Sequence, residues 1–419
     1  MVSLLQTAID LLGRRLLLAG SLLWIALPAA AAGEPIDARY FGIHLHRADT
    51  ATAWPFVRFG SWRLWDAGVD WAKLEPARGQ WRFEKLDRLM ALAEANDVEP
   101  MLTLGVTPTW AAARPHEAFV YGAGGASEPR NLSDWENYVS TVANRYKGRL
   151  RYLEIWNEPK YGDIEPTKGA FFSGTAKNLV DMACAARRVA REVDPNINII
   201  SPGFTGAGDR LERFLTAGGG RCIDIVAFHF YAATPEKMRE RIRDVRQIMQ
   251  RQGVGHLPLW NTEQGYEVVG PRARIPGNLG FEVADEATEA AYIARSLVLG
   301  ADAGLSRFYF YSWERLLNKS GQTKKGVHAL ATSIRWLRGV RIADCHESGK
   351  LWICGLERAD RKAWMVWSTN GVLAWRVPTV WQAQAFERFD GPGGVLADPR
   401  IEIGMAPVLI KQEALAWLP

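Results

Sequence analysis

The chain has 419 residues, of which 48% are hydrophobic and 23% are charged. This composition excludes a disordered chain, a collagen and a small disulfide-stapled domain, and the length allows one barrel of roughly 250 residues with a smaller second domain. Lys and Arg (51) exceed Asp and Glu (46) by five and form no basic block, so nucleic acid is not the expected partner. The 18 Trp residues predict flat apolar platforms as well as core.

Residues 1–32 have the order of an export signal. Arg14 and Arg15 precede an apolar run, 16–27, and Pro28 and four alanines follow it. This order predicts a signal peptide cleaved after Ala32, and an uncleaved membrane anchor is the alternative. We therefore expect an exported protein that is periplasmic, associated with the inner membrane through residues 1–32, or secreted.

The four cysteines fit an oxidising compartment. Cys345 and Cys354 flank a predicted hairpin turn and can be bridged, whereas Cys184 and Cys222 can pair only if the tertiary structure brings them together. Buried free thiols are the alternative. No C-x-x-C motif or Cys/His cluster in the sequence indicates zinc.

Short apolar runs alternate with stretches of helical period between residues 40 and 336. The eight predicted strands are Tyr40–His46, Ser61–Asp66, Pro100–Gly105, Leu150–Asn157, Asn198–Gly203, Ile223–Tyr231, Pro258–Glu263 and Arg307–Trp313. Several are apolar on both faces, as expected for a buried parallel sheet.

Helices are predicted between these strands. Ser133–Glu136 has the pattern of a capping box, and Asp194-Pro195 ends a helix that contains Leu179. Further helical periods cover Phe83–Ala95, Pro235–Gln252, Ala284–Gly300 and Val327–Arg338, and the weakest crossover is 51–59. The alternation predicts a (β/α)₈ TIM barrel over residues 33–338. The alternative is a doubly wound sheet, but in this sequence no G-x-G-x-x-G turn follows the first predicted strand.

Residues 339–419 have a different pattern. Short predicted strands separated by turn residues are Arg341–Cys345, Lys350–Glu357, Ala363–Ser368, Trp375–Pro378, Gln384–Phe389 and Ile401–Gln412. They predict a small C-terminal β-sandwich or β-sheet module that packs against the barrel.

The ends of the predicted barrel strands carry the polar side chains that can support chemistry, because the carboxyl ends of barrel strands face the active site. They are His44, His46, Arg63, Asp66, Asn157, Glu158, His229, Tyr231, Glu263, Trp313 and Glu314. Two carboxylates on nearly opposite strands suit glycoside hydrolysis, in which one must be protonated and the other ionised.

Residues 155–159, Ile-Trp-Asn-Glu-Pro, closely resemble the Asn-Glu-Pro signature on strand four of the clan of retaining (β/α)₈ glycosidases. Thr262-Glu263 lies where that clan has its nucleophile. Segments 62–66, 71–76 and 107–110 resemble family 39, most of all its bacterial branch that hydrolyses biofilm exopolysaccharides. The resemblance covers roughly residues 41–313.

The resemblance implies that Glu158 is the general acid/base and Glu263 the nucleophile. Asn157 would hold the sugar 2-hydroxyl, Arg63 would keep Glu263 ionised, and Tyr231 would donate a hydrogen bond to it. The remaining predicted substrate-binding residues are His44, His229 on the same wall, and Trp313 as a floor for the reactive sugar.

Two other classes of protein compete with this interpretation. A metal-dependent barrel hydrolase would use His44-Leu-His46 as ligands, but strand five lacks a histidine and strand eight lacks an aspartate, so we expect no metal and no cofactor. A polysaccharide-binding or assembly protein with an inactive barrel would have lost one carboxylate, and both are present.

We therefore expect an exported, monomeric, retaining endo-glycosidase that hydrolyses an exopolysaccharide by double displacement. An exo-acting, β-xylosidase-like activity is the alternative. The Gly-rich segments 121–125 and 270–280 are predicted to rim the cleft.

Overall fold

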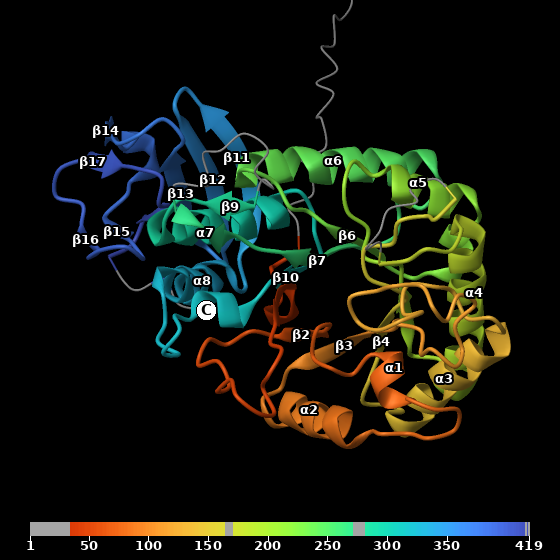
Figure 1. Ribbon diagram of the computed structural model, residues 1–419. Helices are drawn as coiled ribbons and strands as arrows, with labels where there is room; N and C mark the ends of the chain where they lie inside the picture. Colours follow the sequence, from red (N-terminus) through yellow and green to blue (C-terminus); the bar gives the residue numbers. More distant parts are fainter. Residues whose placement is uncertain (1–33, 164–170, 271–280, 415–416, 418–419) are drawn as a thin grey trace, which may run out of the picture. The chain divides into compact units, whose positions relative to one another are not determined.

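The computed structural model describes residues 34–163, 171–270, 281–414 and 417. The eight barrel strands occur in the predicted places: β1 (Phe41–His44), β2 (Ser61–Leu64), β3 (Glu99–Thr103), β4 (Tyr152–Glu154), β5 (Asn198–Ile200), β6 (Val226–His229), β7 (Leu259–Gln264) and β10 (Arg307–Phe310). They pair in parallel in the order β5-β4-β3-β2-β1-β10-β7-β6. Parallel bridges from Ile200 to Ile225 and from Phe204 to Phe228 connect the two ends of this order. The predicted (β/α)₈ barrel is confirmed (Figure 1).

Helices surround the sheet in Figure 1. They are α1 (Trp71–Leu74), α2 (Glu84–Ala95), α3 (Leu132–Arg145), α4 (Ala176–Val193), α5 (Asp209–Thr216), α6 (Pro235–Arg251), α7 (Glu286–Asp302) and α8 (Lys325–Leu337). The described segment between β1 and β2 contains no helix, in line with the weak crossover there. Two short strands, β8 (Glu267–Val268) and β9 (Glu282–Val283), pair with each other after β7.

One predicted helix start was wrong. α3 begins at Leu132 with Asn131 as its N-cap, so Ser133 lies inside the first turn and forms no capping box. A capping box occurs instead at α4, where the Thr175 side chain bonds the backbone of Asn178 and the Asn178 side chain bonds the backbone of Thr175. Asparagine replaces the usual Glu or Gln at this position, which is why the pattern did not stand out.

The barrel interior changes from apolar to polar along the strands. Met101 on β3, Trp260 on β7 and Tyr309 on β10 belong to one buried apolar cluster. Side chains two residues further along a strand point the same way. Thr103 therefore follows Met101 on the same interior face, where it is buried and donates to Glu154 Oε2 at 2.7 Å. The closed sheet thus places a polar floor directly beneath the expected active site.

The C-terminal module consists of two antiparallel sheets. One has the order β11 (Arg341–Ser348), β12 (Leu351–Arg358), β13 (Arg361–Ser368), β18 (Val408–Lys411), β15 (Ala385–Glu387) and β16 (Gly394–Val395), and the other pairs β14 (Leu373–Arg376) with β17 (Arg400–Ile403). The single predicted strand Ile401–Gln412 is therefore wrong. It divides into β17 and β18, in different sheets, around a connection that contains Gly404 and Pro407.

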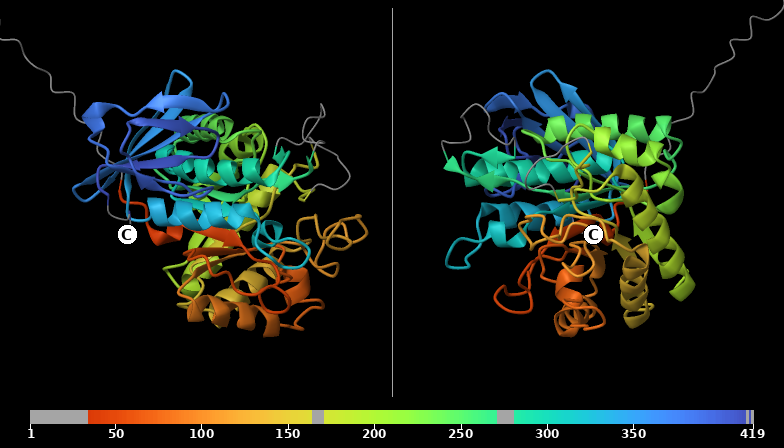
Figure 2. Two further views of the ribbon diagram at one scale, coloured as in Figure 1. Left: turned by 90° about the vertical axis from the view of Figure 1, so that its left-hand side faces the viewer. Right: turned by 45° about the vertical axis from the view of Figure 1, so that its right-hand side comes forward.

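The module lies beside α7 and α8 in Figure 2 and is joined to the barrel by specific contacts. The Trp367 indole donates to Glu236 on α6 at 3.0 Å, and Arg239 donates to the Cys345 carbonyl oxygen at 2.9 Å. The Trp417 indole donates to the Trp336 carbonyl oxygen at 2.9 Å. Indole N–H groups that bond across the junction explain part of the high Trp content.

Both possible disulfides form. Cys184 on α4 is bonded to Cys222, which ends the 3₁₀ helix η2 (Gly219–Cys222). Cys345 and Cys354 are bonded across the β11–β12 hairpin. In the described part of the chain, no helix has the length and apolar character needed to cross a bilayer. The predicted signal segment, residues 1–32, lies outside the described residues.

Candidate active site

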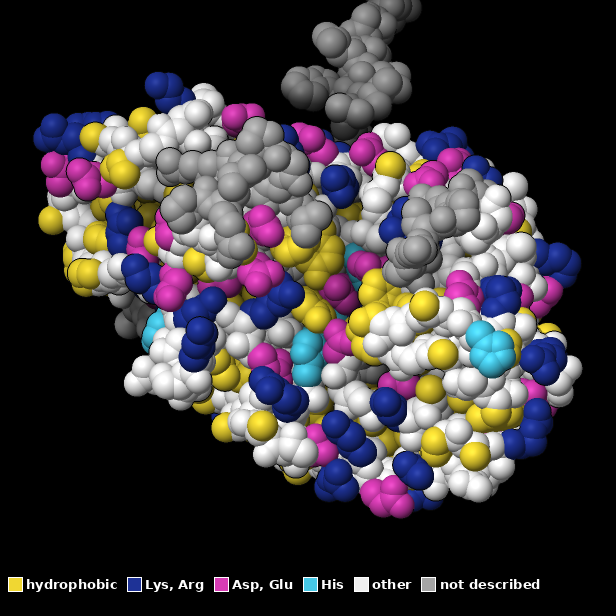
Figure 3. All heavy atoms as spheres, viewed as in Figure 1, with side chains coloured by type: hydrophobic (Ala, Val, Ile, Leu, Met, Phe, Trp, Pro, Cys, Tyr) yellow, Lys and Arg dark blue, Asp and Glu magenta, His cyan; other side chains and the backbone are white. Residues whose placement is uncertain are grey.

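The two predicted catalytic carboxylates lie together. One carboxylate oxygen of Glu158 and one of Glu263 are within 4.8 Å of each other. Both side chains line one cavity of ≈ 670 Å³. On the face drawn in Figure 3, acidic, histidine and hydrophobic side chains gather near the centre, with Lys and Arg side chains around them. The carboxyl ends of the strands therefore form a polar cavity with a pair of acids in it.

Glu158 is presented by an unusual backbone conformation. It follows β4 with φ +40°, in the left-handed region that costs a non-glycine residue about 1–3 kcal/mol. Its N–H group bonds the Gly203 carbonyl oxygen at 2.9 Å, and a parallel bridge joins Asn157 to Gly203. This connection to the strand-five loop holds the Glu158 side chain over the barrel mouth, where 23% of it is exposed.

Glu263 is held from two sides. Arg63 on β2 donates to Glu263 Oε2 at 3.0 Å, and the Tyr231 hydroxyl donates to Glu263 Oε1 at 2.8 Å. Arg63 also contacts Glu154 Oε2 at 2.6 Å and Asn157 Oδ1 at 2.8 Å. The Arg63 guanidinium thereby fixes the nucleophile candidate, a buried carboxylate on β4 and the amide next to Glu158 in one arrangement.

Glu158 and Glu263 have different charged and hydrogen-bonding surroundings. Burial raises the pKa of Glu158, against the opposing effect of Arg63, Arg210 and Lys160. Burial and the nearby charge of Glu158 also raise the pKa of Glu263, and the charge of Arg63 and the hydrogen bond from Tyr231 oppose this rise. Two carboxyls this close do not ionise independently, so one proton is shared between two unlike environments. Glu158, which is only partly exposed, is the member suited to remain protonated, because the cation and the hydroxyl both contact Glu263.

His229 and His44 lie beneath the cavity, and both side chains are completely buried. The His229 Nδ1 atom is 2.8 Å from Glu158 Oε1, and burial lowers the His229 pKa to about 4. The His44 Nε2 atom is 3.0 Å from the Thr262 carbonyl oxygen, and the His44 ring packs on Tyr311. The predicted substrate contacts of these two histidines stay predictions, because both rings are buried and contact Glu158 and Tyr311. Arg63 is buried too, so its contacts are with the acids and not with a ligand.

Trp313 is not a sugar platform. It lies in the 3₁₀ helix η4 (Trp313–Leu316), is 3% exposed, and belongs to the main hydrophobic cluster. β10 ends at Phe310, three residues before the predicted end, so the strand-end position belongs to Tyr311. Tyr311 lines the cavity and donates to Asp66 at 2.8 Å. The alternation of the strand, from Tyr309 to Tyr311, is the signal that could have identified it.

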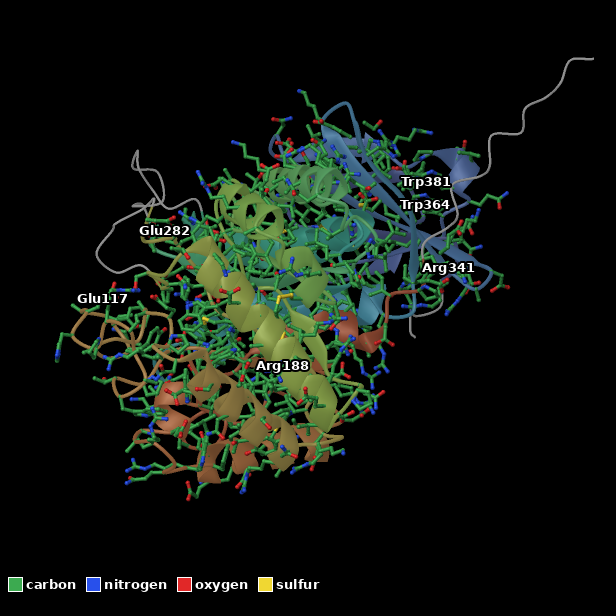
Figure 4. All side chains as sticks on the ribbon, turned by 90° about the vertical axis from the view of Figure 1, so that its right-hand side faces the viewer. Glu117, Arg188, Glu282, Arg341, Trp364 and Trp381 are labelled. Atoms are coloured by element: carbon green, nitrogen blue, oxygen red, sulfur yellow. A yellow bond between two sulfur atoms is a disulfide. The ribbon has the colours of Figure 1, made fainter. Side chains whose placement is uncertain are left out.

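Most of the Trp residues serve packing. Trp364 and Trp381, partly exposed in the module, stack on each other with ring centroids 4.2 Å apart. Figure 4 shows them on the opposite side of the view from Glu117 and Glu282, which lie in the connections that follow β3 and β7. These indoles are therefore away from the loops at the carboxyl ends of the strands.

Of the two Gly-rich segments predicted to rim the cleft, the structure describes essentially one. Tyr121, at the start of the Gly-rich segment 121–125, hydrogen-bonds Asp66 and lines a smaller pocket with Trp65. The second segment, 270–280, lies almost entirely outside the described residues. The wall near β6 instead carries residues that the sequence analysis did not select: Lys237, Arg241, Phe281 and Arg315.

A cation could contact part of this site. Among the described residues, Glu158, His229 and Glu263 are the one group of three His, Cys, Asp or Glu side chains whose ligand atoms all lie within 4.8 Å of one another. The H-x-H histidines of the metal alternative, His44 and His46, are not in it. The His46 ring faces Glu314 at 3.8 Å. The group coincides with the close pair of acids that glycoside hydrolysis requires.

Comparison with known proteins agrees with this geometry. An endo-1,4-β-xylanase of Agaricus bisporus is 27% identical over 140 residues, which are 33% of this chain and 39% of that protein. The chain therefore matches well under half the length of that relative.

Solved structures share the fold. A family 39 glycoside hydrolase from Bacteroides cellulosilyticus WH2 superposes with a TM-score of 0.68 at 18% identity, covering 91% of this chain and 81% of that one. A monomeric β-xylosidase from Caulobacter crescentus CB15 gives 0.63 at 16% identity, covering 92% and 98%. The model of the family "Glycosyl hydrolases family 39" matches residues 37–347. With a (β/α)₈ barrel and two acids at the ends of strands four and seven, this chain belongs to glycosyl hydrolase family 39.

Proposed function

We propose that the protein is a retaining glycosidase that cleaves an exopolysaccharide internally. The observation that carries the proposal is the separation of the two acids. In retaining enzymes the carboxyl groups are about 5–5.5 Å apart, whereas inverting enzymes leave about 6.5–9.5 Å for a water molecule. Oxygens of Glu158 and Glu263 within 4.8 Å of each other fit the shorter range.

In this mechanism Glu263 attacks the anomeric carbon while Glu158 gives its proton to the departing oxygen. A covalent glycosyl-enzyme forms, and Glu158 then takes a proton from the water that releases the sugar. Arg63 and Tyr231 support the ionised form of Glu263. Because Arg63 occupies Asn157 Oδ1, the Asn157 amide group is left to donate to a sugar hydroxyl.

Export is part of the same proposal. The signal-like order of residues 1–32 supports it, and two disulfides suit an oxidising compartment. Comparing the mass of the protein recovered from periplasm, membrane and medium with that of the full chain tests this. Recovery of the full-length, reduced chain from the cytoplasm alone would contradict it.

The function is tested by product analysis on a panel of exopolysaccharides and xylans. Wild type should release oligosaccharides of several lengths, as internal cleavage requires, whereas exo action would release a single small sugar. Glu158→Gln and Glu263→Gln should each lower the rate by about 10³-fold or more. Glu347→Gln, an exposed glutamate on β11, is the matched control and should keep full activity. Undiminished cleavage by both active-site variants would refute the assignment.

A further inference from the structure

One wall of the active-site cavity carries basic side chains that the proposed mechanism does not use. Lys237 and Arg241 come from the first turns of α6, and Arg315 comes from η4. Arg315 is paired with Glu267 at 3.0 Å. Within the described ranges, neither Lys237 nor Arg241 forms an ion pair with a carboxylate, and both side chains are exposed. The cavity therefore has two uncompensated cations at one edge.

The spacing of these two cations opposes helix stability. Lys237 and Arg241 are four residues apart on α6, so they lie on the same helical face, where like charges repel each other. Two other basic residues of α6 have acidic partners: Arg239 pairs with Asp302 and Arg251 with Glu212. An anionic ligand bound in the cavity would relieve the repulsion between Lys237 and Arg241.

The Arg241 guanidinium is already oriented. Its Nη1 atom donates to the Tyr231 carbonyl oxygen at 2.7 Å, and the hydroxyl of the same Tyr231 donates to Glu263. Tyr231 is therefore hydrogen-bonded both to the Arg241 guanidinium and to the nucleophile candidate Glu263. A planar guanidinium offers paired N–H donors that match a carboxylate, and the neighbouring ammonium adds a second positive charge.

We propose that the substrate carries a uronic acid whose carboxylate is bound by Lys237 and Arg241 at the α6 edge of the cavity. This inference rests on the proposed glycosidase function and names its substrate class. A neutral polysaccharide would leave both charges without a partner beside a wall built from Tyr231 and Phe281. The Lys237–Arg241 edge acts as a binding subsite, separate from the acids that perform the chemistry.

The test compares acidic polysaccharides with their own carboxyl-reduced forms, which keep the linkages and lose the charge. Glucuronoxylan and uronic-acid-containing exopolysaccharides serve as probes. Wild type should show a kcat/KM at least about tenfold higher on an acidic polymer than on its reduced form. Lys237→Gln and Arg241→Gln should remove most of this preference, because each should lower kcat/KM on the acidic polymer more than on the reduced one. Lys350→Gln, an exposed lysine in the β11–β12 turn, is the matched control.

The same pair of polymers is titrated by calorimetry against Glu263→Gln, which can bind but not turn over. Tighter binding of the acidic form, abolished when Lys237→Gln is added, is the expected result. Equal rates and equal binding of both forms, unchanged by Lys237→Gln or Arg241→Gln, would overturn the inference and leave the proposed function intact. Failure of the proposed function looks different: no polymer, acidic or neutral, would be cleaved.

Discussion

At the scale of single residues, Glu158 and Glu263 are distinguished by their neighbours. A guanidinium and a phenol hydroxyl contact Glu263, whereas the side chain that contacts Glu158 is an imidazole whose low pKa keeps it uncharged near neutral pH. Opposite charge and hydrogen bonds to an oxygen favour the ionised form of an acid. These surroundings support the proposal that Glu263 is the nucleophile and Glu158 the proton donor.

Replacing Tyr231 by Phe tests this asymmetry. The hydroxyl bonds the ionised Glu263 and opposes the rise in its pKa that burial causes. Losing a hydrogen bond to a charged group costs about 1.5 kcal/mol, which corresponds to about one pKa unit. Activity requires ionised Glu263, so the acidic limb of the kcat/KM profile should move up by about one pH unit. An unchanged acidic limb, measured with the same substrate, would show that the hydroxyl does not act on Glu263.

Removing the Arg63 charge should affect stability as well as catalysis. Arg63→Met leaves Glu154, which is completely buried, without its cation, and breaking a buried pair in this way costs about 3–5 kcal/mol. Urea unfolding monitored by tryptophan fluorescence measures the loss. Arg63→Lys keeps the charge and should lose less. A cost below about 1 kcal/mol for Arg63→Met would mean that the network does not hold the barrel mouth together.

The residues found by sequence reasoning and those missed differ in a physical way. Glu158, Glu263 and Tyr231 were predicted because strand ends and the Asn-Glu-Pro pattern give position along the chain. How deeply a side chain is buried does not follow from such patterns. His44 and His229 occupy the expected strand ends, yet their side chains are completely buried, and Trp313 lies beyond its strand and is buried in the hydrophobic core. Lys237 and Arg241 were missed because charged residues on an amphipathic helix usually mark its solvent-exposed face.

At the scale of elements, the barrel was predictable because buried parallel strands and amphipathic helices have different periods. The ends of the strands and helices were less predictable than their presence. β10 was predicted to reach Trp313, but it ends at Phe310. The chain instead turns close to β7, where the Tyr311 N–H group bonds the Gln264 carbonyl oxygen at 2.9 Å. This is a contact between strands that no local pattern reveals.

Gly265 makes that close approach possible. A Cβ atom at this position would lie 1.9 Å from the Tyr311 carbonyl oxygen, a backbone atom that cannot rotate away. Gly265→Ala should therefore displace Tyr311 from the cavity and lower kcat/KM by tenfold or more, roughly the cost of a 1 Å misplacement in a catalytic site. Gly253→Ala, which meets nothing within 4 Å, controls for the added methyl group, although its φ of +73° adds some strain. Full activity of Gly265→Ala would contradict this packing.

At the scale of the whole molecule, residues 34–419 form one compact unit in which the β module supports the barrel helices. Glu236 on α6 accepts from the Trp367 indole of the module and pairs with Arg295 on α7. These side-chain bonds tie β13 to both helices. The module was predictable as a run of short strands, but its contacts with α6 required the structure.

The two disulfides should contribute unequally to stability. Cys184–Cys222 closes a longer stretch of chain, with a separation of 38 residues, than Cys345–Cys354, with 9. Chain entropy then predicts losses of about 4 kcal/mol for the double substitution Cys184→Ser/Cys222→Ser and about 2.5–3 kcal/mol for Cys345→Ser/Cys354→Ser. Unfolding in urea under non-reducing conditions measures both. Equal losses, or a larger loss from the short hairpin, would show that strain or packing outweighs chain entropy.

The stereochemistry of hydrolysis tests the central claim most directly. Proton NMR of the first sugar released from a cleaved polysaccharide, recorded before mutarotation, reports the configuration of the anomeric carbon. Two displacements on Glu263 predict a product with the configuration of the substrate. A product of inverted configuration would contradict the account, because water would then have attacked directly and left no place for a nucleophile at position 263.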